Sequence, residues 1–413
     1  MEYLAFQSLD ERLQKAIDHE ETPGIVLLIA YRDTLLYHKA FGHAQWIPER
    51  KELTPDTFFD VASLTKVLAT TTSILLLLKS GELGLSEPIS KYFNEFRAPV
   101  KNQITLRHLL THSSGLPAYY RFYQDLWEED QKRGGGFLCT RDAKRQALQR
   151  VLEQDLAYEP GRDYRYSDLG FILLGALIEK VTATDLDLFC QQEIWTPLGL
   201  RQTFFNDLSA RGKPPAPRQV GMPPSPQDVT GPRRFAATEY CPWRKKVMCG
   251  EVHDENCYAM GGVAGHAGLF STSQDIYTLV ARLLRCYRGE EDWIPPALVR
   301  TFFTRQHLPE RSTWALGWDT PSPAGSTSGT LFSRESVGHT GFTGTSLWID
   351  LKKDLVVILL SNRVHPSRNN QQFAKLRPEI HDRVQQLVGS GPWTRDRRQQ
   401  TTRRRGRVAG GGQ

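Results

Sequence analysis

The chain of 413 residues lacks a hydrophobic run long enough to cross a bilayer. Such a span takes about 20 consecutive apolar residues, and the most apolar stretch, around Leu75, is shorter. Residues 1–21 carry charges throughout and lack the basic start and apolar stretch of a secretory signal peptide. As written, the sequence therefore predicts a cytoplasmic protein with no membrane span.

The sequence also lacks paired cysteines. None of its six cysteines stands in a CxxC pair, so we expect them to be reduced thiols in an intracellular chain. Cys241, Cys249 and Cys257 lie eight residues apart, with His253 among them. This spacing fits no common zinc module, so no metal site is predicted.

Only the last residues of the chain carry an excess of basic charge. The formal net charge is +6, and residues 391–413 account for all of it with seven arginines and one aspartate. The rest of the chain is neutral overall, which gives no electrostatic reason to expect a nucleic-acid partner. We expect residues 389–413 to form a basic, disordered tail.

Strand-like sequence is present at both ends of the chain, and helical sequence lies between them. The predicted strands are 24–42 (a hairpin that turns at Arg32-Asp33), 341–350 and 355–362, and the predicted helices begin near Ser63, Thr105 and Phe171. This order predicts an α+β fold. One antiparallel sheet is built from both chain ends and flanked by helices, with a mostly helical lobe inserted.

The predicted domain covers residues 1–388. Its α/β lobe comprises roughly 1–60 and 300–388, and its helical lobe roughly 61–299. Residues 214–232 contain seven prolines, which excludes regular helix or central strand there. Long loops of this kind tend to be functional or disordered.

Ser63 precedes Lys66 by three residues at the start of a helix that is apolar almost all round. Residues i and i+3 share a helix face, so the two side chains should be neighbours. Burial lowers the pKa of a lysine, which can then accept a proton. A serine becomes a good nucleophile only when a base takes its proton. A helix-capping serine followed by a surface lysine would also explain the pair. The catalytic interpretation therefore requires polar partners elsewhere in the sequence.

Two further polar stretches supply such partners. Tyr166-Ser167-Asp168 precedes an apolar helix. A capping aspartate explains Asp168 but does not require Tyr166, whose pKa should fall beside a lysine cation, so that it can serve as acid or base. His339-Thr340-Gly341 lies in a predicted strand, where glycine often marks the close approach of a ligand. That strand could present a backbone N–H to an oxyanion.

The stretches at Ser63–Lys66, Tyr166–Asp168 and His339–Gly341 resemble, in order and spacing, the three motifs of the class C β-lactamase and penicillin-binding-protein superfamily. The resemblance covers roughly residues 22–388. It includes TPGIVLLIA, ITLRHLLTHSSGLP and GHAGLFSTSQDIYTL. It implies that Ser63 forms an acyl-enzyme and that Lys66 and Tyr166 share its proton, without cofactor or metal.

The same resemblance implies that the backbone N–H groups of Ser63 and Phe342 form an oxyanion hole. It also implies a substrate-binding set of Asp168, His339, Thr340 and Gly341. Two positions depart from the usual motifs, because His339 stands where lysine is usual and Asp168 where asparagine is usual. The histidine is more similar to certain D-alanyl-D-alanine carboxypeptidases and esterase relatives.

The histidine also implies a pH dependence. With a pKa of about 6.5, His339 should hold a substrate carboxylate better near pH ~6 than near pH ~8. An ionised Asp168 should repel the same group.

The implied function is that of a serine acyl hydrolase acting on a small-molecule or peptide substrate, with D-amino-acid peptides or related amides favoured. Two alternatives remain open: a promiscuous carboxylesterase of the same fold, and a penicillin-binding protein that acylates without efficient turnover. Residues 250–271 resemble penicillin-binding-protein 4B-type members. They are either a loop lining the substrate cleft or an ordinary polar turn.

Overall fold

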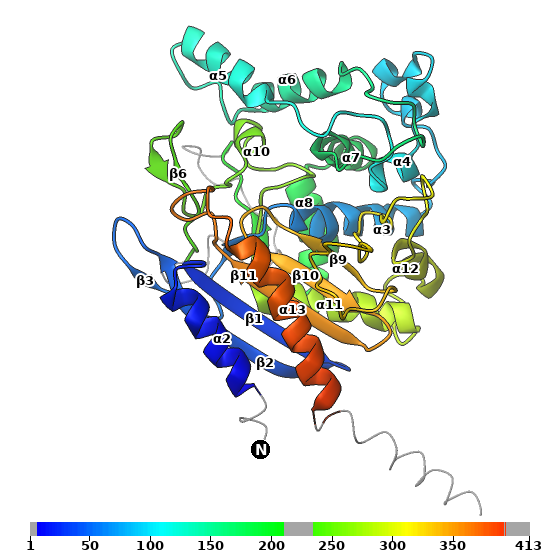
Figure 1. The fold of residues 1–413 in the computed structure, drawn as a ribbon. Helices are drawn as coiled ribbons and strands as arrows, with labels where there is room; N and C mark the ends of the chain where they lie inside the picture. Colours follow the sequence, from blue (N-terminus) through cyan, green and yellow to red (C-terminus); the bar gives the residue numbers. More distant parts are fainter. Residues whose placement is uncertain (1–5, 210–233, 392, 394–413) are drawn as a thin grey trace, which may run out of the picture.

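The two ends of the chain meet in one antiparallel sheet of strand order β3-β2-β1-β11-β10-β9 (Figure 1). The computed structural model describes residues 6–209, 234–391 and 393. The central pairing joins β1 to β11, from Ile25 opposite Ser361 to Tyr31 opposite Leu355. The predicted α+β fold is therefore confirmed. The proline-rich segment 214–232 and the basic tail from residue 394 lie outside the described residues.

The strands of this sheet are β1 (Gly24–Tyr31), β2 (Thr34–Gln45), β3 (Lys51–Glu52), β9 (Val337–Thr340), β10 (Ser346–Asp350) and β11 (Leu355–Ser361). A second sheet has the strand order β4 (Phe59–Asp60), β8 (Leu269–Ser271) and β5 (Phe204–Phe205). A third sheet pairs β6 (Tyr240–Cys241) with β7 (Lys246–Val247).

The α-helices are α2 (Gln7–Asp18), α3 (Thr72–Lys79), α4 (Leu106–Leu110), α5 (Phe122–Lys132), α6 (Arg141–Leu152), α7 (Asp168–Thr182), α8 (Leu186–Cys190), α9 (Thr196–Leu198), α10 (Glu255–Ala259), α11 (Ser273–Arg288), α12 (Pro296–Phe302) and α13 (Phe373–Ser390). Shorter helical segments are η1 (Lys66–Thr71) and η5 (Gln191–Trp195), which are π-helical, and η2 (Ile89–Lys91), η3 (Asn94–Arg97) and η4 (Lys101–Gln103), which are 3₁₀-helical.

Helices cover both faces of the sheet, which explains why β1 is apolar at nearly every position. Its residues alternate between two cores. Ile25, Leu27 and Ile29 pack in the cluster that includes side chains of α2 and α13, and Val26 and Leu28 pack in the larger cluster that includes α11 and the helical region. Figure 1 shows α2 and α13 side by side on one face, with the helical region beyond one end of the sheet.

Two predicted boundaries were wrong. The predicted strand 341–350 begins only at Ser346, because Gly341–Thr345 forms the turn between β9 and β10. The predicted helix at Phe171 begins three residues earlier, at Asp168. Its cap is Ser167, whose hydroxyl accepts a hydrogen bond from the Gly170 N–H at 3.2 Å. Asp168 is therefore not the capping residue, and its carboxylate is available for another role.

A close glycine contact fixes helix α7 against the loop that precedes β8. A Cβ added at Gly265 would lie 2.1 Å from the carbonyl oxygen of Phe171 and 2.8 Å from the amide nitrogen of Gly175. The Gly265 carbonyl also accepts a hydrogen bond from Thr70 Oγ1 at 2.6 Å. The helix that follows Ser63, helix α7 and this loop therefore share one tight contact.

We predict that Gly265→Ala lowers the free energy of unfolding by about 1–3 kcal/mol, because backbone must move to admit the methyl group. Denaturant-induced unfolding measures the change. Gly389→Ala is the control, since an added Cβ there meets nothing within 4 Å, and alanine in a helix is the more stable residue. Equal stability of Gly265→Ala and the unmodified protein would contradict the described contact.

Candidate active site

Ser63 stands out in a buried segment because it alone between Val61 and Thr70 retains partial exposure. The preceding residue, Ala62, has a φ of +48°, which is unusual for a residue with a side chain. The buried carboxylate of Asp60 holds this turn, because its Oδ1 accepts the Ala62 N–H at 2.9 Å. The sharp turn between β4 and η1 thus presents the Ser63 hydroxyl to a cavity.

Lys66 is completely buried, and its ammonium group makes three hydrogen bonds. Nζ donates to Ser63 Oγ at 3.0 Å, to Asp168 Oδ1 at 2.7 Å and to the His266 carbonyl oxygen at 3.0 Å. An ammonium has three donors, so all of them are used. The predicted neighbour relation of Ser63 and Lys66 is observed, and the segment that carries Lys66 is π-helical, a form often found at functional sites.

The expected lowering of both pKa values was wrong. Burial alone would lower the pKa of Lys66, but the adjacent Asp168 carboxylate outweighs it and the net shift is upward. Burial raises the pKa of Tyr166, and the nearby Lys66 cation offsets this only in part. The resting site therefore holds a protonated lysine and a neutral tyrosine.

Tyr166 lies within an aromatic cage. The Tyr166 ring centre is 4.7 Å from that of His112 and 5.7 Å from that of Trp314. Lys66 Nζ lies 4.9 Å from the Tyr166 ring centre. His112 positions the segment, because its Nδ1 accepts the Ser167 N–H at 3.1 Å and its carbonyl accepts the Arg165 N–H at 2.9 Å. The Tyr166 hydroxyl is buried and has no hydrogen-bond partner among the described residues.

His339 is buried on β9 and is not a cation. Its Nδ1 lies 2.9 Å from the Thr340 carbonyl oxygen, which can only accept, so the proton is on Nδ1. Nε2 is then an unprotonated acceptor, and it has no partner in the described part of the chain. Burial, and secondarily the Lys66 charge, lower the pKa of His339 to about 3. The pH-dependent carboxylate binding expected from the sequence does not agree with this environment.

The backbone N–H groups of Ser63 and Phe342, expected from the sequence to form an oxyanion hole, make no hydrogen bond to the described residues. Phe342 lies in the β9–β10 turn, and its side chain is 49% exposed. The sequence suggested that Gly341 admits a ligand, but the structure shows that it admits another part of the protein. A Cβ added at Gly341 would lie 2.6 Å from the Val61 carbonyl oxygen. The glycine thus lets the turn approach the Ser63 segment.

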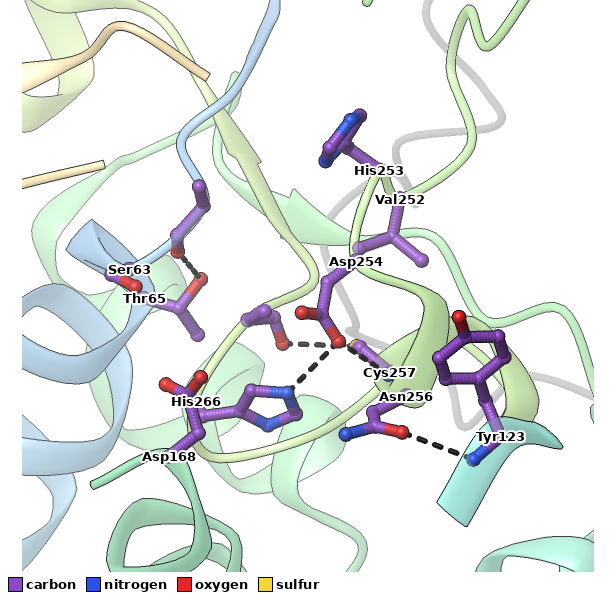
Figure 2. A network of polar contacts seen from close by, with 12 residues as sticks. Ser63, Thr65, Tyr123, Asp168, Val252, His253, Asp254, Asn256, Cys257 and His266 are labelled. Atoms are coloured by element: carbon purple, nitrogen blue, oxygen red, sulfur yellow. Dashed lines mark hydrogen bonds and ion pairs between the residues drawn. The ribbon is translucent and has the colours of Figure 1, made fainter. Parts of the chain in front are cut away.

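For residues 250–271 the sequence allowed either a loop lining the cleft or an ordinary polar turn. The structure shows a loop that lines the cavity with His253, Asp254, Glu255 and His266. Asp254 Oδ1 contacts His266 Nε2 at 3.0 Å and accepts the Cys257 N–H at 2.7 Å (Figure 2). This anchors the residue whose carbonyl binds Lys66. The His253 N–H donates to Asp60 Oδ2 at 2.6 Å, which links the loop to the Ser63 turn.

A cavity of about 790 Å³ brings nearly all of the sequence-predicted site residues together. Its lining includes Ser63, Tyr166, Asp168, His339, Thr340, Gly341 and Phe342, whereas Lys66 lies buried beneath Ser63. Sequence reasoning missed Asp60, His112 and the arginines of the cavity wall. For His112 the signal was available, since it stands in the stretch LLTHSSGLP already matched to the family.

No group of three or more histidine, cysteine, aspartate or glutamate side chains with metal-binding geometry occurs in residues 6–209 and 234–391. Over the same ranges, no helix combines the length and apolar character that a membrane span requires.

We predict that the imidazole of His339 does not titrate between about pH 5 and about pH 8, because burial holds its pKa far below the usual 6.5. Histidine NMR signals followed over this range, with His339→Gln for assignment, test it. A His339 signal with a midpoint near 6.5 would contradict the described burial.

Comparison with known proteins identifies the family of this chain. Residues 9–379 match the Beta-lactamase family. A protein of Escherichia coli (strain K12) named "Putative D-alanyl-D-alanine carboxypeptidase" is 34% identical over 372 residues, covering 85% of this chain and 82% of that protein. One of the same name from Salmonella agona (strain SL483) is 32% identical over 373 residues, covering 86% and 82%.

Solved structures share the fold at lower identity. The octameric penicillin-binding protein homologue from Pyrococcus abyssi has a TM-score of 0.67 at 20% identity, with 93% of this chain and 78% of that chain covered. EstCE1, a hydrolase with promiscuous acyltransferase activity, has a TM-score of 0.65 at 22% identity, with 91% and 100% covered. The match over nearly the whole length shows that this chain belongs to the Beta-lactamase family.

Proposed function

We propose that this protein is a serine acyl hydrolase that forms an acyl-enzyme on Ser63 and acts on D-amino-acid peptides or related amides. One observation carries the proposal: Lys66 Nζ lies 3.0 Å from Ser63 Oγ at the base of a cavity. The free N–H groups of Ser63 and Phe342 support it. Two such donors would stabilise the oxyanion that develops when a serine attacks a carbonyl.

The proton path begins with the Lys66–Asp168 ion pair. Because the resting lysine is protonated, it must first pass a proton to Asp168, across the 2.7 Å between Nζ and Oδ1. The neutral amine then accepts the Ser63 proton as Oγ bonds to the substrate carbonyl carbon. The cationic Lys66 that results stabilises the negative charge on the oxyanion. In this scheme Asp168 is a proton acceptor and not a substrate ligand.

Tyr166 then serves as the acid for the leaving group. Burial raises its pKa and keeps the phenol protonated, and its hydroxyl has no partner among the described residues. When the tetrahedral intermediate collapses, the bond to the leaving nitrogen breaks and Tyr166 donates a proton to that nitrogen. The phenolate formed is stabilised by the Lys66 cation, 4.9 Å from the ring centre. It can later take a proton from the water that hydrolyses the acyl-enzyme. Lys66 then returns a proton to the departing Ser63 Oγ and regains its own from Asp168.

Two observations support the proposed substrate class: the sequence similarity to named relatives and the volume of the cavity. The relatives named as D-alanyl-D-alanine carboxypeptidases are 34% identical to this chain. A volume of about 790 Å³ is ample for a short peptide. A carboxylesterase activity is the second candidate, because the neutral His339 puts no fixed cation on β9 to require an anionic substrate.

We predict that Ser63→Ala abolishes turnover and covalent labelling, because it removes the hydroxyl that lies 3.0 Å from Lys66 Nζ and forms the acyl bond in the proposed mechanism. Mass spectrometry after incubation with a fluorescent penicillin, together with assays of D-alanyl-D-alanine peptides and p-nitrophenyl esters, tests this. The control is Ser80→Ala, the same change at an exposed serine after α3.

The outcomes separate the candidate functions. Peptide turnover supports the peptidase, turnover of esters alone supports the esterase, and a stable adduct without turnover supports a penicillin-binding protein. An adduct that persists in Ser63→Ala would refute the assignment of the nucleophile.

A further inference from the structure

A second cavity lies among helices α6, α7 and α8 of the helical region, whose places Figure 1 shows. Its volume is about 260 Å³, and among the described residues none lines both this cavity and the one beside Ser63. Drug-sized ligands occupy pockets of about 300 to about 1,000 Å³, so this cavity suits a shorter molecule. The apolar part of its lining consists of Leu148, Ile172, Ala176, Leu186, Met260 and Ala264.

Charged side chains complete the lining, and the basic ones outnumber the acidic ones. The basic residues are Arg141, Lys144 and Arg145, and the acidic residues are Glu179 and Asp185. Both acids are already paired, Glu179 with Lys144 and Asp185 with Arg141. Arg145 pairs instead with Asp142, which does not line the cavity. The lining therefore carries more positive charge than its own acids neutralise, which favours an anion over a cation.

Lys144 is the least exposed of these bases and has unused donors. Its side chain is 25% exposed, against 82% for Arg141 and 76% for Arg145. Lys144 Nζ donates to Glu179 Oε1 at 2.6 Å, which is its one hydrogen bond within the described part of the chain. An ammonium has three donors, so the others remain available beside the apolar lining. A carboxylate placed at Lys144 would accept charge-assisted hydrogen bonds from them.

The second cavity also touches both segments that hold Lys66. Gly175 of α7 and Gly265 of the loop line it, and a Cβ added at Gly175 would lie 2.8 Å from the Gly265 amide nitrogen. Helix α7 begins at Asp168, whose carboxylate accepts a hydrogen bond from Lys66. The residue after Gly265 is His266, whose carbonyl oxygen also accepts from Lys66. A ligand in this cavity thus contacts the two elements whose spacing sets the contacts of Lys66.

We propose that the second cavity is an effector site for a short aliphatic carboxylate, whose chain lies among the apolar side chains and whose carboxylate lies at Lys144. The hydrophobic effect drives burial of the chain, and the ammonium fixes its orientation. Because the ligand packs against both Gly175 and Gly265, its binding and the contacts of Lys66 influence each other reciprocally. The site is separate from Ser63, so it stands or falls independently of the proposed hydrolase function.

Hexanoate tests the site, and the methyl group of Met260 reports where it binds. Met260 lines the second cavity, whereas Met248 is buried elsewhere. In NMR spectra of protein labelled at the methionine methyl groups, with Met260→Leu for assignment, hexanoate should shift the Met260 signal and leave the Met248 signal unchanged. Hexanol should bind more weakly, and hexylamine more weakly still. An unmoved Met260 signal would overturn the site, and equal affinities of the three compounds would refute carboxylate recognition.

Two variants test the two ends of the ligand. Lys144→Gln should weaken hexanoate binding by about 10- to 100-fold, as expected for loss of a charge-assisted hydrogen bond, and its retained hexanol binding would show an intact cavity. Ala176→Phe should abolish binding of both compounds by filling the cavity. The controls are Lys180→Gln on α7 and Ala297→Phe on α12, both exposed and outside the lining. Unchanged hexanoate affinity in Lys144→Gln or Ala176→Phe would refute the site.

The link to Lys66 is measured without turnover, so its result does not depend on the hydrolase function. In protein labelled at lysine Cε, saturating hexanoate should shift the Lys66 signal of the unmodified protein but not that of Ala176→Phe. Gly265→Ala displaces the backbone at the contact with Gly175 and should in turn weaken hexanoate binding by about fivefold or more. A Lys66 signal that does not respond to bound hexanoate would overturn the effector role.

Discussion

The buried ammonium of Lys66 is the constraint on which the rest of the site depends. A cation with no exposure is stable only if each donor finds an acceptor. Its acceptors come from three separate parts of the chain: Ser63, Asp168 at the start of α7, and His266 in the loop before β8. Folding therefore cannot satisfy Lys66 without bringing Ser63, Asp168 and the loop that carries His266 together.

The same ion pair, between Lys66 and Asp168, influences the charge states of the neighbouring groups. Asp168 neutralises Lys66 and raises its pKa, and burial keeps Tyr166 a neutral phenol at rest. In the proposed mechanism, the proton therefore moves within the Lys66–Asp168 pair before Ser63 attacks. Lysine in place of His339 would add a second cation to this site. The neutral histidine avoids that repulsion.

The order of strand-like and helical stretches predicted the α+β fold, because it follows from local periodicity. The grouping of Ser63, Lys66, Tyr166 and His339 in one site was expected from the resemblance to the family's three motifs. The direction of the Lys66 pKa shift could not be predicted, because it depends on the 2.7 Å contact to Asp168, which is 102 positions away in the sequence. The raised pKa of Tyr166 could not be predicted either, because it follows from complete burial in the folded protein.

The charge of Lys66 is the most direct test of this account. NMR of protein labelled at lysine Cε, with Lys66→Met to identify the signal, follows that charge through a pH titration. The account predicts an ammonium that persists above the usual pKa of about 10.4. It also predicts a lower midpoint in Asp168→Asn, where burial acts without a counter-charge. A Lys66 amine that is already neutral at pH ~7 in the unmodified protein would contradict the account.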